Sequence, residues 1–295
     1  MKNHWIRTIV IFFLGIWPAL SEETPERIVW NVVSGSTDKW IQAFTSHVRD
    51  GDIVLIPEGN GGGVADLPRA LGKYHQVSAK LRELGLKDVT YGIYTSDLVN
   101  VETVAAGIKA EPGIALIGYG YEPGYAREFP KDSDLGWTWP NALANVTKAK
   151  TTAAASGKRL ILIPNGRALL ESDLRKFAWN YAEFLTKSGA DLMLVQTQTW
   201  IGKGRFEEAI DKLASQLKAG RVDFSKVSVQ VTVEPGQVSN KNGVDAAAAL
   251  QAVMTSRARG FNTISLWVAY VDLNAPLDFI GSLEKSLRPP APKGH

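Results

Sequence analysis

The chain has 295 residues, with 33 lysines and arginines against 30 aspartates and glutamates, four histidines and no cysteine. The lack of cysteine excludes disulfide frameworks, zinc ribbons, iron–sulfur sites and thiol nucleophiles. The formal charge of +3 is too small to indicate binding to nucleic acid or to an anionic membrane surface.

Residues 1–21 have the pattern of a secretory signal peptide. Lys2 and Arg7 precede a short apolar run, and a small-residue pattern closes the segment. The run is shorter than the roughly 20 residues that cross a bilayer, although an uncleaved N-terminal anchor stays open as an alternative. We therefore expect an exported protein, periplasmic or extracellular, that has no membrane contact once the signal is removed.

Short runs of β-branched and apolar residues alternate with amphipathic helical patterns along the rest of the chain. The expected strands are 28–33, 53–56, 89–95, 114–118, 160–163, 192–196, 227–233 and 263–269. Apolar residues recur every three or four positions, as on the buried face of a helix, over 67–84, 174–184, 206–217 and 280–287. This alternation predicts parallel strands joined by crossover helices.

Eight strand–helix units predict a single-domain (β/α)8 TIM barrel over residues 22–288, followed by a flexible proline-rich tail over 289–295. Barrels of this kind typically have about 250 residues, which fits the length of the chain. A doubly wound open sheet is the competing architecture. No Gly-x-Gly-x-x-Gly follows the first strand, which weakens the dinucleotide-binding form of that sheet, and we expect no cofactor.

In such a barrel the active site is formed by the loops that leave the carboxyl ends of the strands. Polar and aromatic side chains occur at these ends, including Glu58, Asn165, Arg167, Gln196, Gln198, Trp200, Trp267 and Tyr270. None of the four histidines falls there, which disfavours Ser-His-Asp hydrolysis and histidine-rich metal sites. The acidic residues near these ends have no recognisable ligand spacing, so we expect no metal site.

Side-chain alternation selects two glutamates among these ends. Over 227–233 four valines form one face, so the polar face should point into the barrel, and that face continues to Glu234. Glu122 has the same parity as two glycines of its own strand, which are small enough for a crowded interior. Trp267 lies on the more polar face of the last strand. These three side chains are expected to converge on one cavity. The glycine-rich turn after Glu58 is expected to let the Glu58 carboxylate enter the same cavity.

This constellation resembles the large clan of (β/α)8 glycoside hydrolases with catalytic glutamates at the ends of strands four and seven. The resemblance implies that Glu122, within Tyr-Glu-Pro, is the general acid/base and that Glu234, within Val-Glu-Pro, is the nucleophile. It also implies that Trp267 lies beneath a bound sugar. Tyr121 stands where the clan usually has an asparagine that contacts the sugar. The strand-four signature Asp-x-x-Asp-x-Asp-x-Glu of the chitinase-like families is absent.

The stretch after the fourth strand is rich in aromatic residues, which offer flat apolar faces to sugars. They are Tyr119, Tyr121, Tyr125, Phe129, Trp137 and Trp139. The same rings can instead form a small core under a long loop, and both interpretations stay open. Trp200, at the end of the sixth strand, is a further candidate platform.

Together these features predict a secreted glycoside hydrolase that cleaves a glycosidic bond of a polysaccharide or glycoconjugate with two glutamates. Asn165, Arg167, Gln196 and Gln198 are the expected contacts to sugar hydroxyls, beside Tyr121, Trp200 and Tyr270. One alternative is a non-catalytic exported carbohydrate-binding barrel. Another is a barrel of a different superfamily that uses Glu58 or Arg167 on an anionic substrate.

Overall fold

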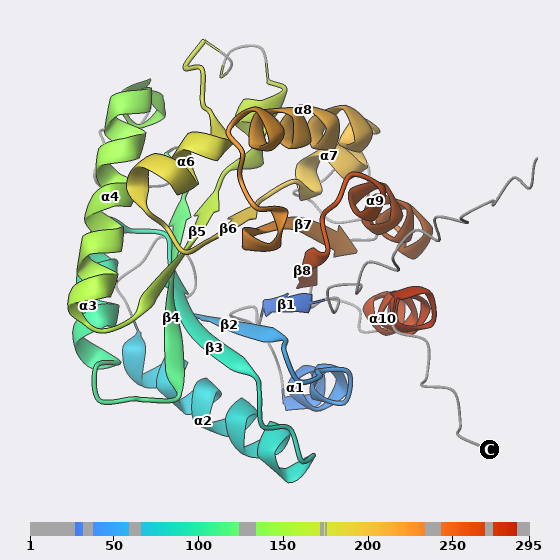
Figure 1. The fold of residues 1–295 in the computed structure, drawn as a ribbon. Helices are drawn as coiled ribbons and strands as arrows, with labels where there is room; N and C mark the ends of the chain where they lie inside the picture. The colour runs from blue at the N-terminus through green and yellow to red at the C-terminus, as the bar shows by residue number, and fades with distance from the viewer. Residues whose placement is uncertain are drawn as a thin grey trace, which may run out of the picture.

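The computed structural model describes residues 27–31, 38–58, 66–123, 134–171, 174, 176–233, 243–268 and 274–287. Within these ranges eight parallel strands close into a barrel, each strand paired with the next in the chain and the last paired with the first (Figure 1). The TIM-barrel prediction is therefore confirmed. The expected signal segment 1–21 and the tail 289–295 lie outside the described residues.

All eight predicted strands are present, with ends that differ by at most a few residues. They are β1 (Arg27–Asn31), β2 (Ile53–Pro57), β3 (Thr90–Thr95), β4 (Ile114–Tyr121), β5 (Arg159–Pro164), β6 (Leu192–Val195), β7 (Val227–Val233) and β8 (Thr263–Val268). β4 runs three residues further than its apolar core predicts. Its pairing with β5 continues as far as Tyr121, which carries the strand to the position just before Glu122.

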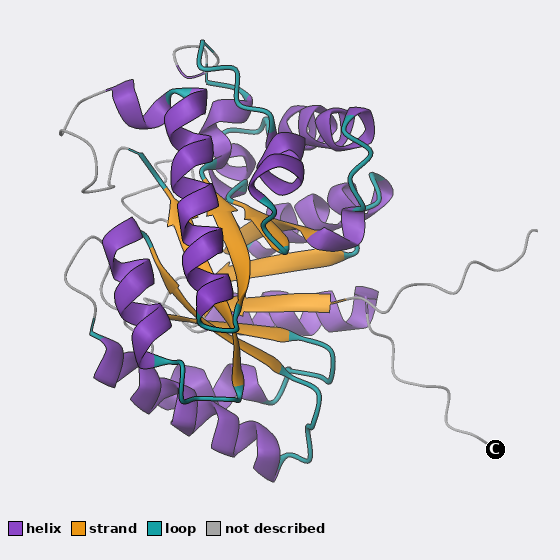
Figure 2. Ribbon diagram, turned by 60° about the vertical axis from the view of Figure 1, so that its left-hand side comes forward, coloured by secondary structure: helices purple, strands orange, loops and turns teal. Residues whose placement is uncertain are grey.

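Helices surround the strands on the outside of the ring (Figures 1 and 2). They are α1 (Asp38–Thr45), α2 (Leu67–Glu83), α3 (Leu98–Gly107), α4 (Trp139–Ala155), α6 (Tyr181–Ser188), α7 (Gln198–Gly202), α8 (Phe206–Ala219), α9 (Ala246–Ala258) and α10 (Asn274–Leu287), with short 3-10 helices η1 (Asp134–Trp137), η2 (Gly166–Leu169) and η3 (Phe224–Lys226). No helix in the described part of the chain has the length and apolar character needed to cross a membrane.

The continuous helix predicted over 174–184 is wrong. Ala178 has a φ of 52°, a left-handed conformation that interrupts a right-handed helix. α6 begins only at Tyr181, where the side chain of Asn180 accepts a hydrogen bond from the backbone N–H of Ala182 at 3.1 Å. Asn180 is thus a helix N-cap in the middle of an apolar pattern.

Alternation along β7 divides its side chains between two environments, as predicted. Val227, Val229, Val231 and Val233 are buried in the core between strands and helices. Ser228, Gln230 and Thr232 alternate with them and are also buried, which places them inside the ring. The corresponding residues of β8, Thr263 and Ser265, are polar too.

The other strands fill the interior with apolar side chains. Val29, Ile53, Leu55, Leu116, Ile161, Ile163 and Leu194 form one buried cluster, and Tyr94 packs against it. The interior therefore has a polar side at β7, β8 and the end of β1, and an apolar side at the remaining strands. Gly118 of β4 is needed here because a Cβ atom at this position would lie 2.3 Å from the Cβ of Tyr94.

Replacing Gly118 with alanine tests this packing. We expect Gly118→Ala to destabilise the barrel by about 1–3 kcal/mol, because β3 and β4 must move apart to admit the methyl group. Gly72→Ala is the matched control, since nothing lies within 4 Å of its added Cβ in α2. That change should stabilise the protein by about 0.5–1 kcal/mol. Thermal unfolding of both variants measures the difference, and equal melting temperatures would contradict the described packing.

Candidate functional site

Glu122 follows β4 directly and lies at the carboxyl end of the barrel. Leu116 of the same strand is inside the ring, and alternation gives Glu122 the same direction. Its Oε1 accepts a hydrogen bond from Nε2 of Gln196 at 2.8 Å. Because Gln196 follows β6, this bond connects the ends of two strands that are separated by β5. The structure thus brings together two of the predicted site residues.

Burial raises the pKa of the Glu122 carboxyl above its usual range, and the hydrogen bond from Gln196 offsets only part of that increase. In the described part of the chain no basic side chain forms a salt bridge with Glu122. A carboxyl group that is buried and lacks a counter-charge keeps its proton to higher pH than an exposed one. Glu122 is therefore suited to donate a proton.

Residues after β5 hold Gln196 in place. Asn165 and Gln196 form a parallel bridge beyond the ends of β5 and β6, and the backbone N–H of Gln196 donates to Pro164 O at 3.1 Å. Gly166 packs so closely against this segment that a Cβ atom there would lie 2.0 Å from the carbonyl oxygen of Gln196. The backbone of Gln196 is thus fixed on two sides, which limits where its amide can point.

Asn165 and Arg167 are engaged in local contacts. Oδ1 of Asn165 accepts from the backbone N–H of Arg167 at 2.8 Å and caps η2. The Asn165 carbonyl accepts from the hydroxyl of Tyr181 at 2.6 Å. Arg167 is exposed, and its Nε donates to Oε1 of Glu171 at 2.8 Å. Asn165 therefore lies beside Gln196, whereas the guanidinium of Arg167 is paired at the rim.

Two of the predicted aromatic contacts lie in the core. The hydroxyl of Tyr121 donates to Gly136 O at 2.5 Å, and the ring is fully buried, because residues 121 and 122 must point to opposite sides of the strand. Trp200 is 1% exposed, and its Nε1 donates to Gly166 O at 2.9 Å. Neither ring presents a face to solvent in this arrangement, so both serve packing here.

The aromatic residues after β4 form a small core, which is the second of the two interpretations left open by the sequence. Tyr121 packs against Trp179 with tilted rings, and Trp179 in turn contacts Trp137, Tyr181 and Phe184. Trp139 packs against Phe184 with ring centroids 4.8 Å apart. Tyr125 and Phe129, from the same stretch of sequence, lie outside the described residues.

Contrary to the prediction from the sequence, the side chain of Glu58 does not face the same cavity as that of Glu122 but points toward the helices. It has the parity of Val54 and Ile56, which face the helices, and its Oε1 accepts from Nδ2 of Asn100 on α3 at 3.1 Å. The side chain is buried, and burial raises its pKa while hydrogen bonds from Thr95 and Asn100 partly lower it. The carboxylate faces α3 because residue 58 falls one position beyond the inward set of β2.

Trp267 occupies an inward position near the carboxyl end of β8, the same end of the barrel as Glu122, and the residue is only partly buried. Gln198, the first residue of α7, has a buried Oε1 with no hydrogen-bond partner among the described residues. The proposed nucleophile Glu234 and the aromatic residue Tyr270 lie outside the described residues. Within the described ranges no three histidine or acidic side chains gather to hold a metal ion.

A polar column lies below Trp267; its β7 residues are the inward polar face predicted from the alternation, whereas Asn31 of β1 was not among the predicted site residues. Ser228 Oγ, Gln230 Oε1 and Thr232 Oγ1 are buried and have no hydrogen-bond partner within the described ranges. Asn31, at the end of β1, donates from Nδ2 to Ser265 Oγ at 2.6 Å and to Leu266 O at 3.0 Å. The alternation that selected Glu234 also marks these residues as inward, so the signal was present in the sequence.

No family model matches the chain, and no curated relative matches it. Solved structures do match in fold. A GH18 chitinase from Pseudoalteromonas aurantia aligns with a TM-score of 0.56 at 11% identity, covering 89% of this chain and 100% of the other. The PgaB (BpsB) glycoside hydrolase domain from Bordetella bronchiseptica gives 0.56 at 10% identity, covering 92% and 100%. The HMG-CoA lyase from Bacillus subtilis gives 0.53 at 13% identity, covering 89% and 87%. At these identities the matches show the barrel fold alone.

The raised pKa of Glu122 predicts a pH-dependent effect of Glu122→Gln on stability. Because the folded state binds this proton more tightly than the unfolded chain, wild-type stability falls as pH rises from the unfolded pKa, about 4.3, through the folded one. The Glu122→Gln variant has no carboxyl group to titrate at this position, so its stability does not fall in this way as pH rises. Its melting temperature relative to wild type should therefore be higher at pH 8 than at pH 4, by about 2–4 °C.

Thermal unfolding of both proteins across that pH range measures the effect. Glu102→Gln is the matched control, because Glu102 is an exposed carboxylate of α3 that pairs with Lys148. A difference for Glu122→Gln that is constant with pH, or that decreases as pH rises, would show that burial does not raise this pKa.

Proposed function

We propose that the protein is a secreted glycoside hydrolase that cleaves a glycosidic bond of a polysaccharide or glycoconjugate. The observation that carries the proposal is the inward, partly buried Glu122 at the end of β4, held by Gln196 and with a raised pKa. In this proposal Glu122 is the general acid/base and Glu234 is the nucleophile. The pattern of residues 1–21 supports export.

The chemistry requires two carboxyl groups in different protonation states. One must be protonated to assist departure of the leaving oxygen, and the other must be ionised to attack the anomeric carbon or to activate water. Burial favours the neutral form of Glu122, which matches the first role. Ionisation of Glu234 would raise the pKa of Glu122 further if the two groups share one cavity.

The substrate contacts in this proposal come from the same end of the barrel. Trp267 offers a partly exposed ring to the apolar face of a sugar. Gln196, Asn165 and Gln198 provide amides for hydroxyl groups, and Oε1 of Gln198 has no hydrogen-bond partner among the described residues. Tyr121 and Trp200 are left out because their rings are enclosed by protein.

The residues of β4 argue against the usual chitinase arrangement, although chitinases are among the fold matches. Gly118, Gly120 and Glu122 have the spacing of Asp-x-Asp-x-Glu, with glycines at both aspartate positions. Tyr94 occupies the space beside Gly118, so an aspartate would collide there. A second carboxylate must then come from another strand, which supports the role given to Glu234.

The same two glycines favour a second candidate, a non-catalytic exported barrel that binds carbohydrate. Only one of the four acidic positions of the full signature, the one at Glu122, carries a carboxylate here, as expected for a barrel that binds a sugar without cleaving it. In that case Trp267 and the amides would still contact sugar. The two candidates differ in whether any glycan is hydrolysed.

Hydrolysis of a glycan panel by wild type, Glu122→Gln and Glu234→Gln tests the proposal. Each substitution should lower kcat/KM by about 100-fold or more, because each removes an acid, base or nucleophile while preserving shape. Glu102→Gln should retain wild-type activity, since Glu102 is exposed on α3. Reducing-end release and glycan binding are measured on the same proteins.

Turnover that survives both Glu122→Gln and Glu234→Gln would contradict the two-glutamate mechanism. Binding of a glycan by wild type without any hydrolysis would support the non-catalytic candidate. In that case Trp267→Ala should weaken binding, because it removes the proposed ring platform.

A further inference from the structure

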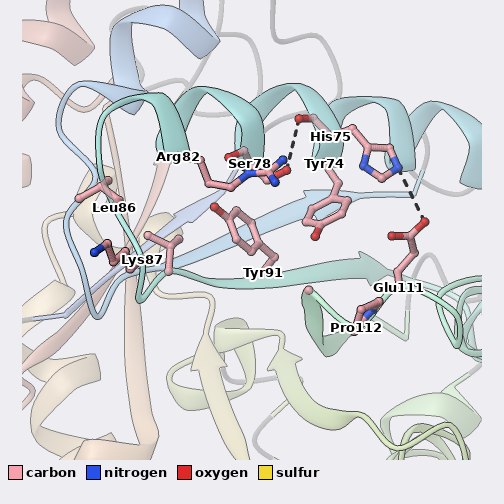
Figure 3. Close-up of a pocket in the computed structure, with 11 residues that line it drawn as sticks. Tyr74, His75, Ser78, Arg82, Leu86, Lys87, Tyr91, Glu111 and Pro112 are labelled. Atoms are coloured by element: carbon pink, nitrogen blue, oxygen red, sulfur yellow. Dashed lines mark hydrogen bonds and ion pairs between the residues drawn. The ribbon is translucent and has the colours of Figure 1, made fainter.

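A cavity of about 430 Å³ lies at the amino-terminal end of the barrel, opposite Glu122. It is formed by the second half of α2, the start of β3 and the turn before β4 (Figure 3). Its volume falls within the range of small-molecule sites, about 300–1,000 Å³. The aromatic and charged side chains that line it are Tyr74, His75, Arg82, Lys87, Tyr91 and Glu111.

Two tyrosine rings form the apolar part of this cavity. Tyr74 and Tyr91 meet edge to face with ring centroids 5.3 Å apart. Burial raises the pKa of Tyr91 to about 12 and also raises that of Tyr74, so both hydroxyls are neutral donors at physiological pH. Gly113 makes room for this pair, because a Cβ atom there would lie 2.1 Å from the hydroxyl oxygen of Tyr74.

Three basic side chains line this cavity, and two of them lie near a carboxylate of the described residues. Lys87 lies near Asp50, whose carboxylate is attracted by the ammonium group and accepts from the Lys87 backbone N–H at 2.8 Å. At the other end His75 Nε2 lies 3.7 Å from Glu111 Oε1. Figure 3 shows the two rings between Lys87 and the His75–Glu111 pair.

Arg82 reaches the rings from α2. Its Nε donates to the backbone carbonyl of Ser78 at 3.2 Å. Its positive charge offsets part of the increase that burial causes in the pKa values of Tyr74 and Tyr91, so the guanidinium lies near both phenols. Among the described residues no carboxylate forms a salt bridge with Arg82. The terminal N–H groups of this side chain are the natural partner of a bound anion.

We propose that this cavity binds a ring-shaped monocarboxylate. The carboxylate would pair with the guanidinium of Arg82, the ring would pack on Tyr91 and Tyr74, and a ring hydroxyl would donate to Glu111. Planar guanidinium groups match carboxylates in a two-bond geometry, and tyrosine faces accept both aromatic rings and the apolar face of a sugar. An acidic sugar and an aromatic acid share this chemistry. The site is separate from the one proposed around Glu122.

Isothermal titration of the full chain with D-glucuronate and with 4-hydroxybenzoate tests the proposal. At least one of the two should bind with a 1:1 stoichiometry and a Kd of about 1 mM or lower. Glucose, which lacks the carboxylate, and acetate, which lacks the ring, should bind at least about tenfold more weakly. The acid that binds more tightly shows whether the site prefers a sugar acid or an aromatic acid.

Variants assign the binding to this cavity. Arg82→Gln should weaken it about tenfold or more, because a charge-assisted hydrogen bond is lost. Arg82→Lys should retain part of the affinity, and Tyr91→Ala should weaken binding by removing the ring. Lys218→Gln is the control for loss of an exposed positive charge on a helix, here α8.

Glu122→Gln should bind these acids as wild type does, which separates this site from glycan hydrolysis. Unchanged melting temperatures would show that Arg82→Gln and Arg82→Lys fold normally. Failure of both acids to bind wild type, or equal binding by wild type and Arg82→Gln, would overturn the proposal.

Discussion

The structure depends on one constraint: in a closed ring of parallel strands, each strand must divide alternate side chains between the ring and the helices. Gly118 is small because Tyr94 already occupies the interior beside it. Tyr121 is buried under the helices because Glu122, the next residue, faces the barrel mouth. The bond between Glu122 and Gln196 follows, since both residues face inward at the ends of β4 and β6 and can reach each other past the end of β5.

Much of the barrel could be predicted from this alternation. All eight strands were found, and the valine and polar faces of β7 were assigned to the correct sides. The inward direction of Glu122 could be predicted because it shares its parity with two glycines of the same strand, which fit a crowded interior. The same rule should have excluded Tyr121 from the mouth, because it precedes Glu122 by one residue. It should also have drawn attention to Asn31, which lies inward at the end of β1.

Other features depend on contacts between segments distant in sequence. Alternation along β2 turns Glu58 toward the helices, but no local pattern reveals that its hydrogen-bond partner there is Asn100 of α3. Trp200 is buried because a short helix follows β6 and directs its indole N–H to the Gly166 carbonyl. The break before α6 depends on a left-handed Ala178, which apolar spacing does not signal. The cavity near Arg82 joins α2, β3 and the turn before β4, so only the folded chain shows it.

The most direct test of the account is the distance between the carboxyl groups of Glu122 and Glu234 in a crystal structure of the protein. The two-glutamate mechanism predicts that both carboxyl groups face one cavity, separated by about 5–5.5 Å for a retaining enzyme or about 6.5–9.5 Å for an inverting one. A separation beyond about 10 Å, or a Glu234 side chain directed away from Glu122, would contradict the two-glutamate mechanism.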